Sequence, residues 1–222
     1  MEKRYILFDL DGTLTASYEG IINAVVYSLK QFGIEPKPER FSEVIGPPLR
    51  HTFMDMYGMS KDESEQAIRF FHEYYDEKGL FENRPYDGVE DMLHTLYAHG
   101  KKLMIATAKA QTIAERVADH FGLSQYLCFI AGTNADFVAE GDGIRATKED
   151  VIKYILESND IKDPEKAVMV GDRAYDITSA KKFGIQTMGV LYGYGTGEEL
   201  LSAGADYLAK DPKDVERYII EG

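Results

Sequence analysis

Short apolar runs recur along the chain and predict buried β-strands. The clear ones span residues 5–8, 103–106, 127–130, 167–170 and 187–191, and a weaker one spans 205–208. The runs are continuously apolar rather than alternating, which is typical of a parallel sheet covered by helices on both faces. From about residue 85 onward, apolar positions at helical spacing separate them. This order predicts an α/β fold with a doubly wound parallel sheet.

The stretch from residue 16 to residue 82 breaks this alternation. Its first helical stripe, residues 21–32, is ended by Gly33, and Ser60-Lys61-Asp62-Glu63 predicts a capping box at the start of a later helix. Pro47-Pro48 can open a helix between the two. The stretch contains no convincing strand. We therefore expect a small all-helical cap domain, residues 16–82, inserted after the first strand of a core formed by residues 1–15 and 83–222.

The net charge and the lengths of the apolar segments limit which binding partners we expect. The chain has 222 residues and a formal net charge of −13. An acidic surface repels phosphate backbones, so we expect no nucleic-acid partner. No segment approaches the roughly 20 apolar residues of a membrane span, and the N-terminus lacks the apolar stretch of a signal peptide. We expect a cytoplasmic protein without a membrane partner, and the sequence does not indicate an oligomeric state.

Cys128 is the only cysteine, which excludes an internal disulfide. It lies in the apolar run Leu127-Cys128-Phe129-Ile130. A buried thiol is therefore expected there rather than a nucleophile.

Two acidic motifs follow predicted strands. Asp9 and Asp11 stand in Asp9-Leu10-Asp11-Gly12-Thr13 directly after the first strand, and Asp172 and Asp176 follow the strand at 167–170. Ligands of open α/β sheets gather at the carboxyl ends of strands, so these side chains are expected at one site. Oxygen ligands from two strands suit Mg²⁺. A solvated turn or a helix N-cap explains either motif alone but not both.

Two further segments offer groups for an anion. Thr107 closes the strand at 103–106, and its hydroxyl and the following N–H groups, beginning with Ala108, can bind a phosphate oxygen if a helix starts there. An N-cap threonine is the alternative. Lys148 begins a helix that Thr147 can cap. A lysine is disfavoured by the helix dipole at that end, which favours a nearby anion.

These four segments, in this order, resemble the haloacid dehalogenase-like superfamily, and the resemblance covers essentially the whole chain. The pattern is DxDGT, then Thr or Ser after a strand, then Lys, then GDxxxD. Ile45-Gly46-Pro47-Pro48-Leu49 and Gly189-Val190-Leu191-Tyr192-Gly193-Tyr194-Gly195 look like the branch of bacterial 5′-nucleotidases and phosphoglycolate phosphatases. The resemblance implies a magnesium-dependent phosphatase acting on a small phosphorylated metabolite.

Roles follow from the resemblance at the matching positions. Asp9 would attack phosphorus and form an aspartyl-phosphate, and Asp11 would protonate the leaving oxygen. Mg²⁺ would be bound by Asp9, the backbone carbonyl of Asp11 and Asp172, with Asp176 orienting water or Lys148. Thr107, Ala108 and Lys148 would hold the phosphate.

Substrate choice is expected from the insert, with Arg50 as the candidate to contact the leaving group; a surface salt bridge is the alternative. Lys109 could add positive charge beside Thr107. The loop from Gly193 to Gly197 is interpreted as a loop beside the site. A sugar phosphomutase and a non-catalytic binding or regulatory protein on the same scaffold are the rival functions, whereas Asp11 argues against a dehalogenase.

Overall fold

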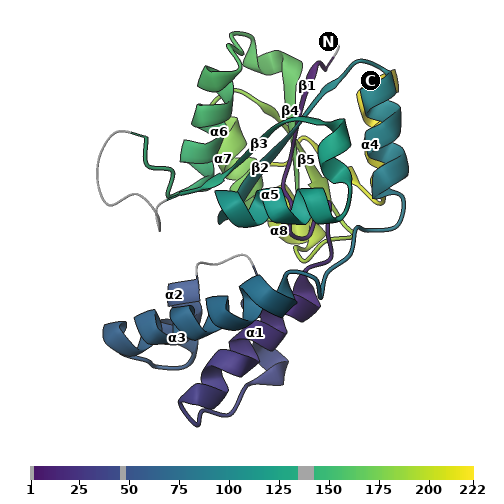
Figure 1. Cartoon of the computed structure of the whole chain (residues 1–222). Helices are drawn as coiled ribbons and strands as arrows, with labels where there is room; N and C mark the ends of the chain where they lie inside the picture. The colour runs from purple at the N-terminus through teal and green to yellow at the C-terminus, as the bar shows by residue number, and fades with distance from the viewer. Residues whose placement is uncertain (1–2, 46–48, 135–142) are drawn as a thin grey trace. The chain divides into compact units, whose positions relative to one another are not determined.

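A six-stranded parallel sheet forms the centre of the larger of two compact units (Figure 1). The computed structural model describes residues 3–45, 49–134 and 143–222. The sheet has the order β3-β2-β1-β4-β5-β6. Its strands are β1 Tyr5–Phe8, β2 Lys102–Ala110, β3 Leu127–Thr133, β4 Ala167–Gly171, β5 Gln186–Val190 and β6 Tyr207–Ala209. The predicted doubly wound α/β fold is confirmed, and all six predicted strands are present.

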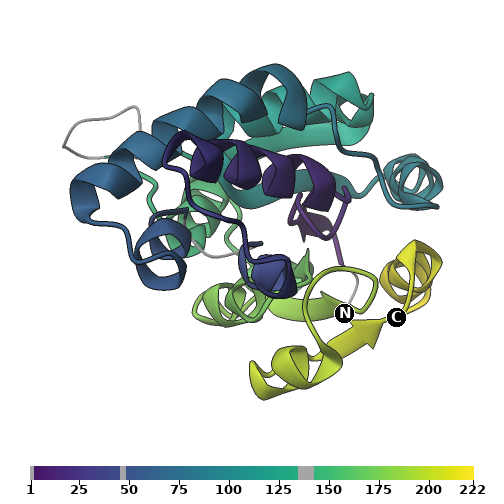
Figure 2. The same cartoon turned by 90° about the horizontal axis from the view of Figure 1, so that it is seen from below.

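Helices connect these strands. They are α4 Val89–Ala98, α5 Gln111–His120, α6 Lys148–Ser158, α7 Ala174–Lys181, α8 Gly197–Ser202 and α9 Pro212–Glu221, with short 3₁₀ turns at Leu123–Tyr126 and Pro164–Lys166. α6 and α7 pack against each other on one side of the sheet, and α9 lies beside α4 (Figure 2). Thr147 caps α6 in a capping box with Asp150, as its position in the sequence predicts.

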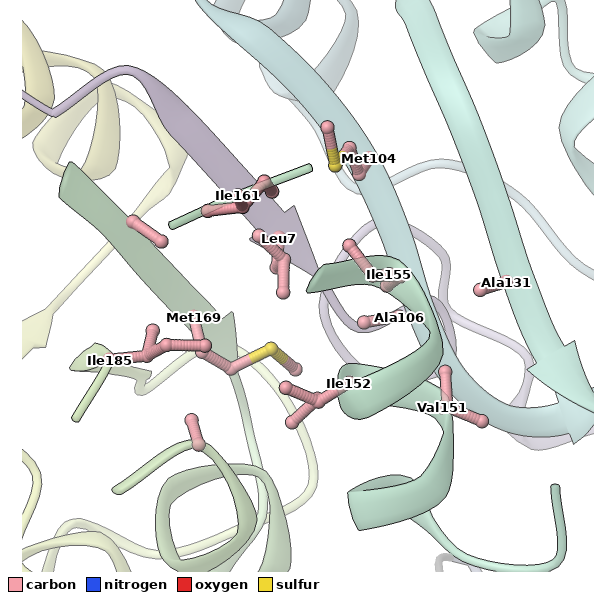
Figure 3. Close-up of a cluster of buried hydrophobic side chains, with 12 residues drawn as sticks. Leu7, Met104, Ala106, Ala131, Val151, Ile152, Ile155, Ile161, Met169 and Ile185 are labelled. Atoms are coloured by element: carbon pink, nitrogen blue, oxygen red, sulfur yellow. The ribbon is translucent and has the colours of Figure 1, made fainter. Parts of the chain in front are cut away.

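One face of the sheet packs against α6 through a fully apolar cluster. Leu7 of β1, Met104 of β2 and Met169 of β4 meet Ile152 and Ile155 of α6 (Figure 3). All five side chains are buried. Since α6 begins with Lys148, this packing also fixes where the amino end of the helix lies relative to the sheet.

The expectation for Cys128 is wrong, because its side chain is exposed. β3 is an edge strand, and most of its residues are only partly buried. Phe129 of the same run packs against the apolar cluster at α6, whereas Cys128 is exposed. Its Sγ donates a hydrogen bond to the Leu103 carbonyl, at 3.3 Å.

The second compact unit is helical. The core unit consists of Met1–Ala16 with Pro85–Gly222, and the helical unit is Ser17–Arg84, inserted between β1 and β2. Its elements are α1 Tyr18–Gln31, a 3₁₀ turn Pro38–Glu43, α2 Leu49–His51, a π-helical turn Thr52–Met56, α3 Lys61–Tyr74 and a second π-helical turn Tyr75–Gly79. No strand occurs among its described residues.

Local sequence signals explain the helix ends of this unit. The capping box at Ser60 is present, with Glu63 as its partner. Gly33 takes a positive φ of 65° just after α1 ends, a conformation that glycine adopts at little cost. Pro47 and Pro48 lie outside the described residues. Within the described part of the chain, none of the helices has both the length and the apolar character needed to cross a membrane.

Truncating the core beneath α6 should destabilise the protein. We expect Ile152→Ala to lower the free energy of unfolding by about 2–5 kcal/mol, since it removes buried methylenes and leaves a cavity. The neighbouring Lys153 is solvent-exposed, so Lys153→Ala should change it by no more than about 0.5 kcal/mol. Urea denaturation of both variants measures the difference, and equal effects would contradict the assigned packing.

Candidate active site

The acidic motifs meet because β1 and β4 are neighbours in the sheet. Phe8 pairs with Val170, and the Asp9 N–H donates to the Val170 carbonyl at 2.9 Å. Asp9 directly follows β1 and Asp172 directly follows β4. Both side chains leave the same edge of the sheet and both are buried. The sequence interpretation that strand ends gather these aspartates agrees with this register.

Asp9 uses its two carboxylate oxygens differently. Oδ1 accepts a hydrogen bond from the Leu10 N–H at 2.7 Å and lies 2.9 Å from Lys148 Nζ. Oδ2 has no hydrogen bond to any residue that the structure describes. One oxygen is therefore fixed and the other is available to a ligand.

Lys148 is a buried ammonium at the centre of the site. Its Nζ lies 2.9 Å from Asp9 and 2.7 Å from Asp176, and it donates to the Ala106 carbonyl at 2.7 Å. Burial acts to lower the pKa of Lys148, but Asp176 and Asp9 outweigh it, so the pKa lies above its ordinary value. The lysine is therefore charged and offsets part of the local negative charge.

Asp172 and Asp176 are completely buried. Burial raises the pKa of Asp172 to about 8, and Asp176 and Asp9 add to that rise. Burial likewise raises the pKa of Asp176 to about 6, although Lys148 opposes it. Carboxyl groups crowded in this way favour either a proton or a cation.

Asp9, Asp172 and Asp176 form a group that could hold a metal ion. One carboxylate oxygen from each lies within 4.8 Å of the others. An all-oxygen set of this kind suits Mg²⁺ or Ca²⁺ rather than a soft metal. Asp176 is also committed elsewhere: it pairs with Lys148 and accepts the Arg173 N–H at 3.1 Å. Asp9 and Asp172 are therefore the better candidates for direct ligands.

Two glycines, Gly12 and Gly193, allow the loops that contain them to approach Asp172 closely. Gly12 has a φ of 85°, and a Cβ there would lie 2.2 Å from Asp172 Oδ2. A Cβ on Gly193 would lie 2.3 Å from the Gly12 carbonyl oxygen. The Tyr194 N–H donates to Asp172 Oδ2 at 2.8 Å. The loop after β5 thus holds Asp172 directly, a role that the sequence did not reveal because its glycines indicate only a turn.

Asp11 lies apart from the three clustered aspartates. Its Oδ2 is 2.6 Å from Lys109 Nζ, whereas its Oδ1 is buried without a hydrogen-bond partner among residues 3–45, 49–134 and 143–222. The pair with Lys109 was not predicted, although the sequence singled out both residues. The expected metal contact of the Asp11 backbone carbonyl stays a prediction.

Thr107 is buried but does not stand at a helix start. β2 continues to Ala110, and α5 begins at Gln111. The strand is longer than its apolar run because residues beyond Ala106 still pair with β3 after a register shift. The N-cap alternative for Thr107 is therefore wrong. Its Oγ1 accepts the Lys109 N–H at 3.2 Å, and the exposed Ala108 accepts a hydrogen bond from Thr133 Oγ1 at its carbonyl.

Arg50 belongs to the helical unit. Its guanidinium lies 3.6 Å from the Glu65 carboxylate, and both side chains are partly exposed. This is the surface pair considered from the sequence as the alternative role. A contact of Arg50 with a ligand stays a prediction.

Comparisons of sequence and of structure relate this chain to the same family of hydrolases. The family described as haloacid dehalogenase-like hydrolase matches residues 6–190. A 5′-nucleotidase of Pseudomonas aeruginosa is 38% identical over 88% of this chain and 86% of its own length. A phosphoglycolate phosphatase of Aquifex aeolicus is 31% identical over 96% of this chain and 94% of its own. A crystal structure described as a predicted phosphatase from Clostridium acetobutylicum is 39% identical and superposes with a TM-score of 0.90, each chain covered completely.

One relative carries a different activity in its name. The tyrosine-protein kinase PtkA of Mycobacterium tuberculosis is 36% identical over 87% of this chain. The matching segment is 64% of the length of PtkA. The scaffold is thus shared by proteins that are named for hydrolysis and for phosphoryl transfer.

The buried carboxyl cluster predicts an unusual dependence of stability on pH. The pKa of Asp172 in the folded protein, about 8, lies above the value of about 4 expected when unfolded. Between these values the folded protein binds more protons, so its free energy of unfolding should fall as the pH rises. Urea denaturation at about pH 5 and about pH 8 measures this change in protein freed of divalent cations. We expect the free energy of unfolding to fall between the two pH values, and to fall less in Asp172→Asn.

Added Mg²⁺ serves as the second arm of that experiment. It should raise the melting temperature of the unmodified protein, since binding only to the folded state stabilises it, and should have little effect on Asp172→Asn. The matched control is Asp91→Asn, which removes an exposed carboxylate on α4. If Asp172→Asn and Asp91→Asn behave alike, the cluster does not bind the cation.

Proposed function

Since the chain belongs to the haloacid dehalogenase-like hydrolase family, we propose that it is a magnesium-dependent phosphatase that hydrolyses small phosphomonoesters through a phosphorylated Asp9. The observation that carries the proposal is the environment of Asp9. The Leu10 N–H and Lys148 fix one carboxylate oxygen and leave the other without a hydrogen bond among the described residues. A carboxylate held by one oxygen is oriented for attack with the other.

The first step transfers the phosphoryl group to the protein. Asp9 Oδ2 attacks phosphorus, the bond between phosphorus and the ester oxygen breaks, and that oxygen takes a proton from Asp11. In the second step a water oxygen attacks the same phosphorus, the bond to Asp9 breaks, and Asp11 takes a proton from the water. Asp9 and Asp11 both end as they began, and the products are an alcohol and phosphate.

Lys148 makes this attack electrostatically feasible. An anionic carboxylate and an anionic phosphate repel each other, and a charged lysine 2.9 Å from Asp9 offsets that repulsion. Asp176 fixes the lysine from its other side at 2.7 Å. Thr107 and the backbone of Ala108, at the carboxyl end of the neighbouring strand, are the proposed contacts for the remaining phosphate oxygens.

Mg²⁺ fits the residues that the site provides. Asp9 and Asp172 would hold it together with the backbone carbonyl of Asp11, and Asp176 would orient the surrounding groups. Bound there, the ion would supply positive charge to the phosphate oxygens and keep the crowded carboxylates ionised. Asp172 is itself positioned by the Tyr194 N–H at 2.8 Å.

The relatives support a small phosphorylated metabolite as substrate. One is named a 5′-nucleotidase and another a phosphoglycolate phosphatase, and we propose a nucleoside monophosphate, phosphoglycolate or a similar ester. In this proposal the helical insert supplies the residues that select the leaving group, with Arg50 as the first residue to test.

Two other functions use the same residues. A phosphomutase would return the phosphoryl group to the sugar instead of to water. The similarity to PtkA favours a second candidate, transfer of the phosphoryl group from Asp9 to a tyrosine. Release of phosphate from a simple ester separates hydrolysis from both.

Replacing the proposed nucleophile tests the proposal. We expect Asp9→Asn to lower the rate of phosphate release by at least about 10³-fold, since an amide cannot form the phosphorylated intermediate. The substitution removes one of several crowded buried carboxylates, so the fold should be retained. Asp91→Asn is the control with expected normal turnover. Undiminished release by Asp9→Asn would overturn the assignment.

The substrate is found by screening phosphate release with and without Mg²⁺. The screen covers nucleoside monophosphates, phosphoglycolate, sugar phosphates and phosphotyrosine, with ATP and a tyrosine peptide as the transfer arm. Phosphorylated peptide without free phosphate would favour the kinase alternative.

A further inference from the structure

A lysine from the strand beside β1 holds Asp11. Lys109 Nζ lies 2.6 Å from Asp11 Oδ2, and the two side chains are 9% and 19% exposed. The contact arises from the sheet: Phe8 pairs with Ile105, and β2 runs on to Ala110. The chain after β1 therefore passes beside the end of β2, and residue 109 lies within reach of residue 11.

The two oxygens of Asp11 have different surroundings. Oδ2 is engaged by Lys109, while Oδ1 is buried and has no hydrogen-bond partner among the described residues. An ammonium group can donate to Oδ2 whether or not Oδ1 carries a proton. Lys109 can therefore fix the direction of Oδ1 throughout a reaction cycle in which Oδ1 gives up and regains a proton.

We propose that Lys109 is a positioning residue that holds Asp11 so that Oδ1 faces the leaving oxygen of the substrate. This inference rests on the proposed function and adds a residue to it. It differs from the role suggested by the sequence, in which Lys109 contacts the substrate itself. The pair would serve the proton transfer to the ester oxygen, and Lys109 would touch neither phosphorus nor Mg²⁺.

The surroundings favour positioning over substrate binding. Lys109 is already paired with a carboxylate at 2.6 Å, which leaves less unbalanced positive charge to attract a phosphate. The buried cation beside Asp9 is a different residue, Lys148. The region thus contains one lysine paired with the nucleophile and another paired with the proposed proton donor.

Aryl phosphates of similar size test this idea, because the need for a proton increases with the basicity of the leaving oxygen. The nitrophenolate released from nitrophenyl phosphate is a weak base and can leave without a proton, whereas the phenolate released from phenyl phosphate is more basic. The quantity to measure is kcat/KM, which reports the steps up to departure of the leaving group. We expect Lys109→Met to lower it for phenyl phosphate by at least about 10-fold more than for nitrophenyl phosphate.

Further variants separate positioning from loss of structure. Lys109→Arg should recover part of the activity toward phenyl phosphate, because a guanidinium can donate to Oδ2. Asp11→Asn should show the same dependence of kcat/KM on the leaving group. The double variant Asp11→Asn, Lys109→Met should have a kcat/KM close to that of Asp11→Asn alone, since the two residues act as a unit. Lys102→Met, an exposed lysine at the start of the same strand, is the control with unchanged kinetics. Melting temperatures verify that each variant folds.

Each outcome decides the inference. An equal loss of kcat/KM for both aryl esters would show that Lys109 binds the phosphate group or supports the fold, and would overturn positioning, as would an absence of any effect. If the unmodified protein hydrolyses no phosphomonoester, the proposed function and this inference both fall. If it does hydrolyse them in a manner that requires Asp9, only the inference is at risk.

Discussion

Negative charge buried at the junction of β1 and β4 is the constraint on which the rest of the site depends. Three aspartates bring their carboxylates together where water is excluded, and the same junction is the expected place for an anionic phosphate. Such an arrangement is stable only if cations or protons compensate it. Lys148 supplies positive charge to the cluster, while burial and the neighbouring carboxylates raise the pKa values of Asp172 and Asp176. In the proposed function, a divalent cation would complete the balance.

Much of the surrounding structure places these charges. The apolar packing of α6 against the sheet and the capping box at Thr147 bring Lys148 to the strand ends. Gly12 and Gly193 let two loops approach Asp172 more closely than any side chain would allow. The proposed site therefore draws on groups that follow β1, β4 and β5 and on the first residue of α6, which are far apart in the sequence.

The sequence predicted the fold well because the strands contain short apolar runs, such as residues 5–8, 103–106 and 167–170, separated by helical patterns. It also predicted that Asp9 and Asp172 would share one edge, since parallel strands place their carboxyl ends together. What it could not give depends on side-chain geometry. The pair between Lys109 and Asp11 needs the register of β1 and β2 and the extension of β2 beyond its apolar run. The exposure of Cys128 depends on β3 being at the edge, which the order of strands along the chain does not reveal.

In the proposed mechanism Asp9 becomes phosphorylated, and this intermediate can be trapped chemically. The protein is mixed with a phosphomonoester and Mg²⁺, quenched rapidly and treated with borohydride, which reduces an aspartyl-phosphate to homoserine. Peptide mass spectrometry then locates the reduced residue. We expect homoserine at position 9 and at no other aspartate. Continued release of phosphate with Asp9 unmodified, or homoserine at another position, would contradict this mechanism.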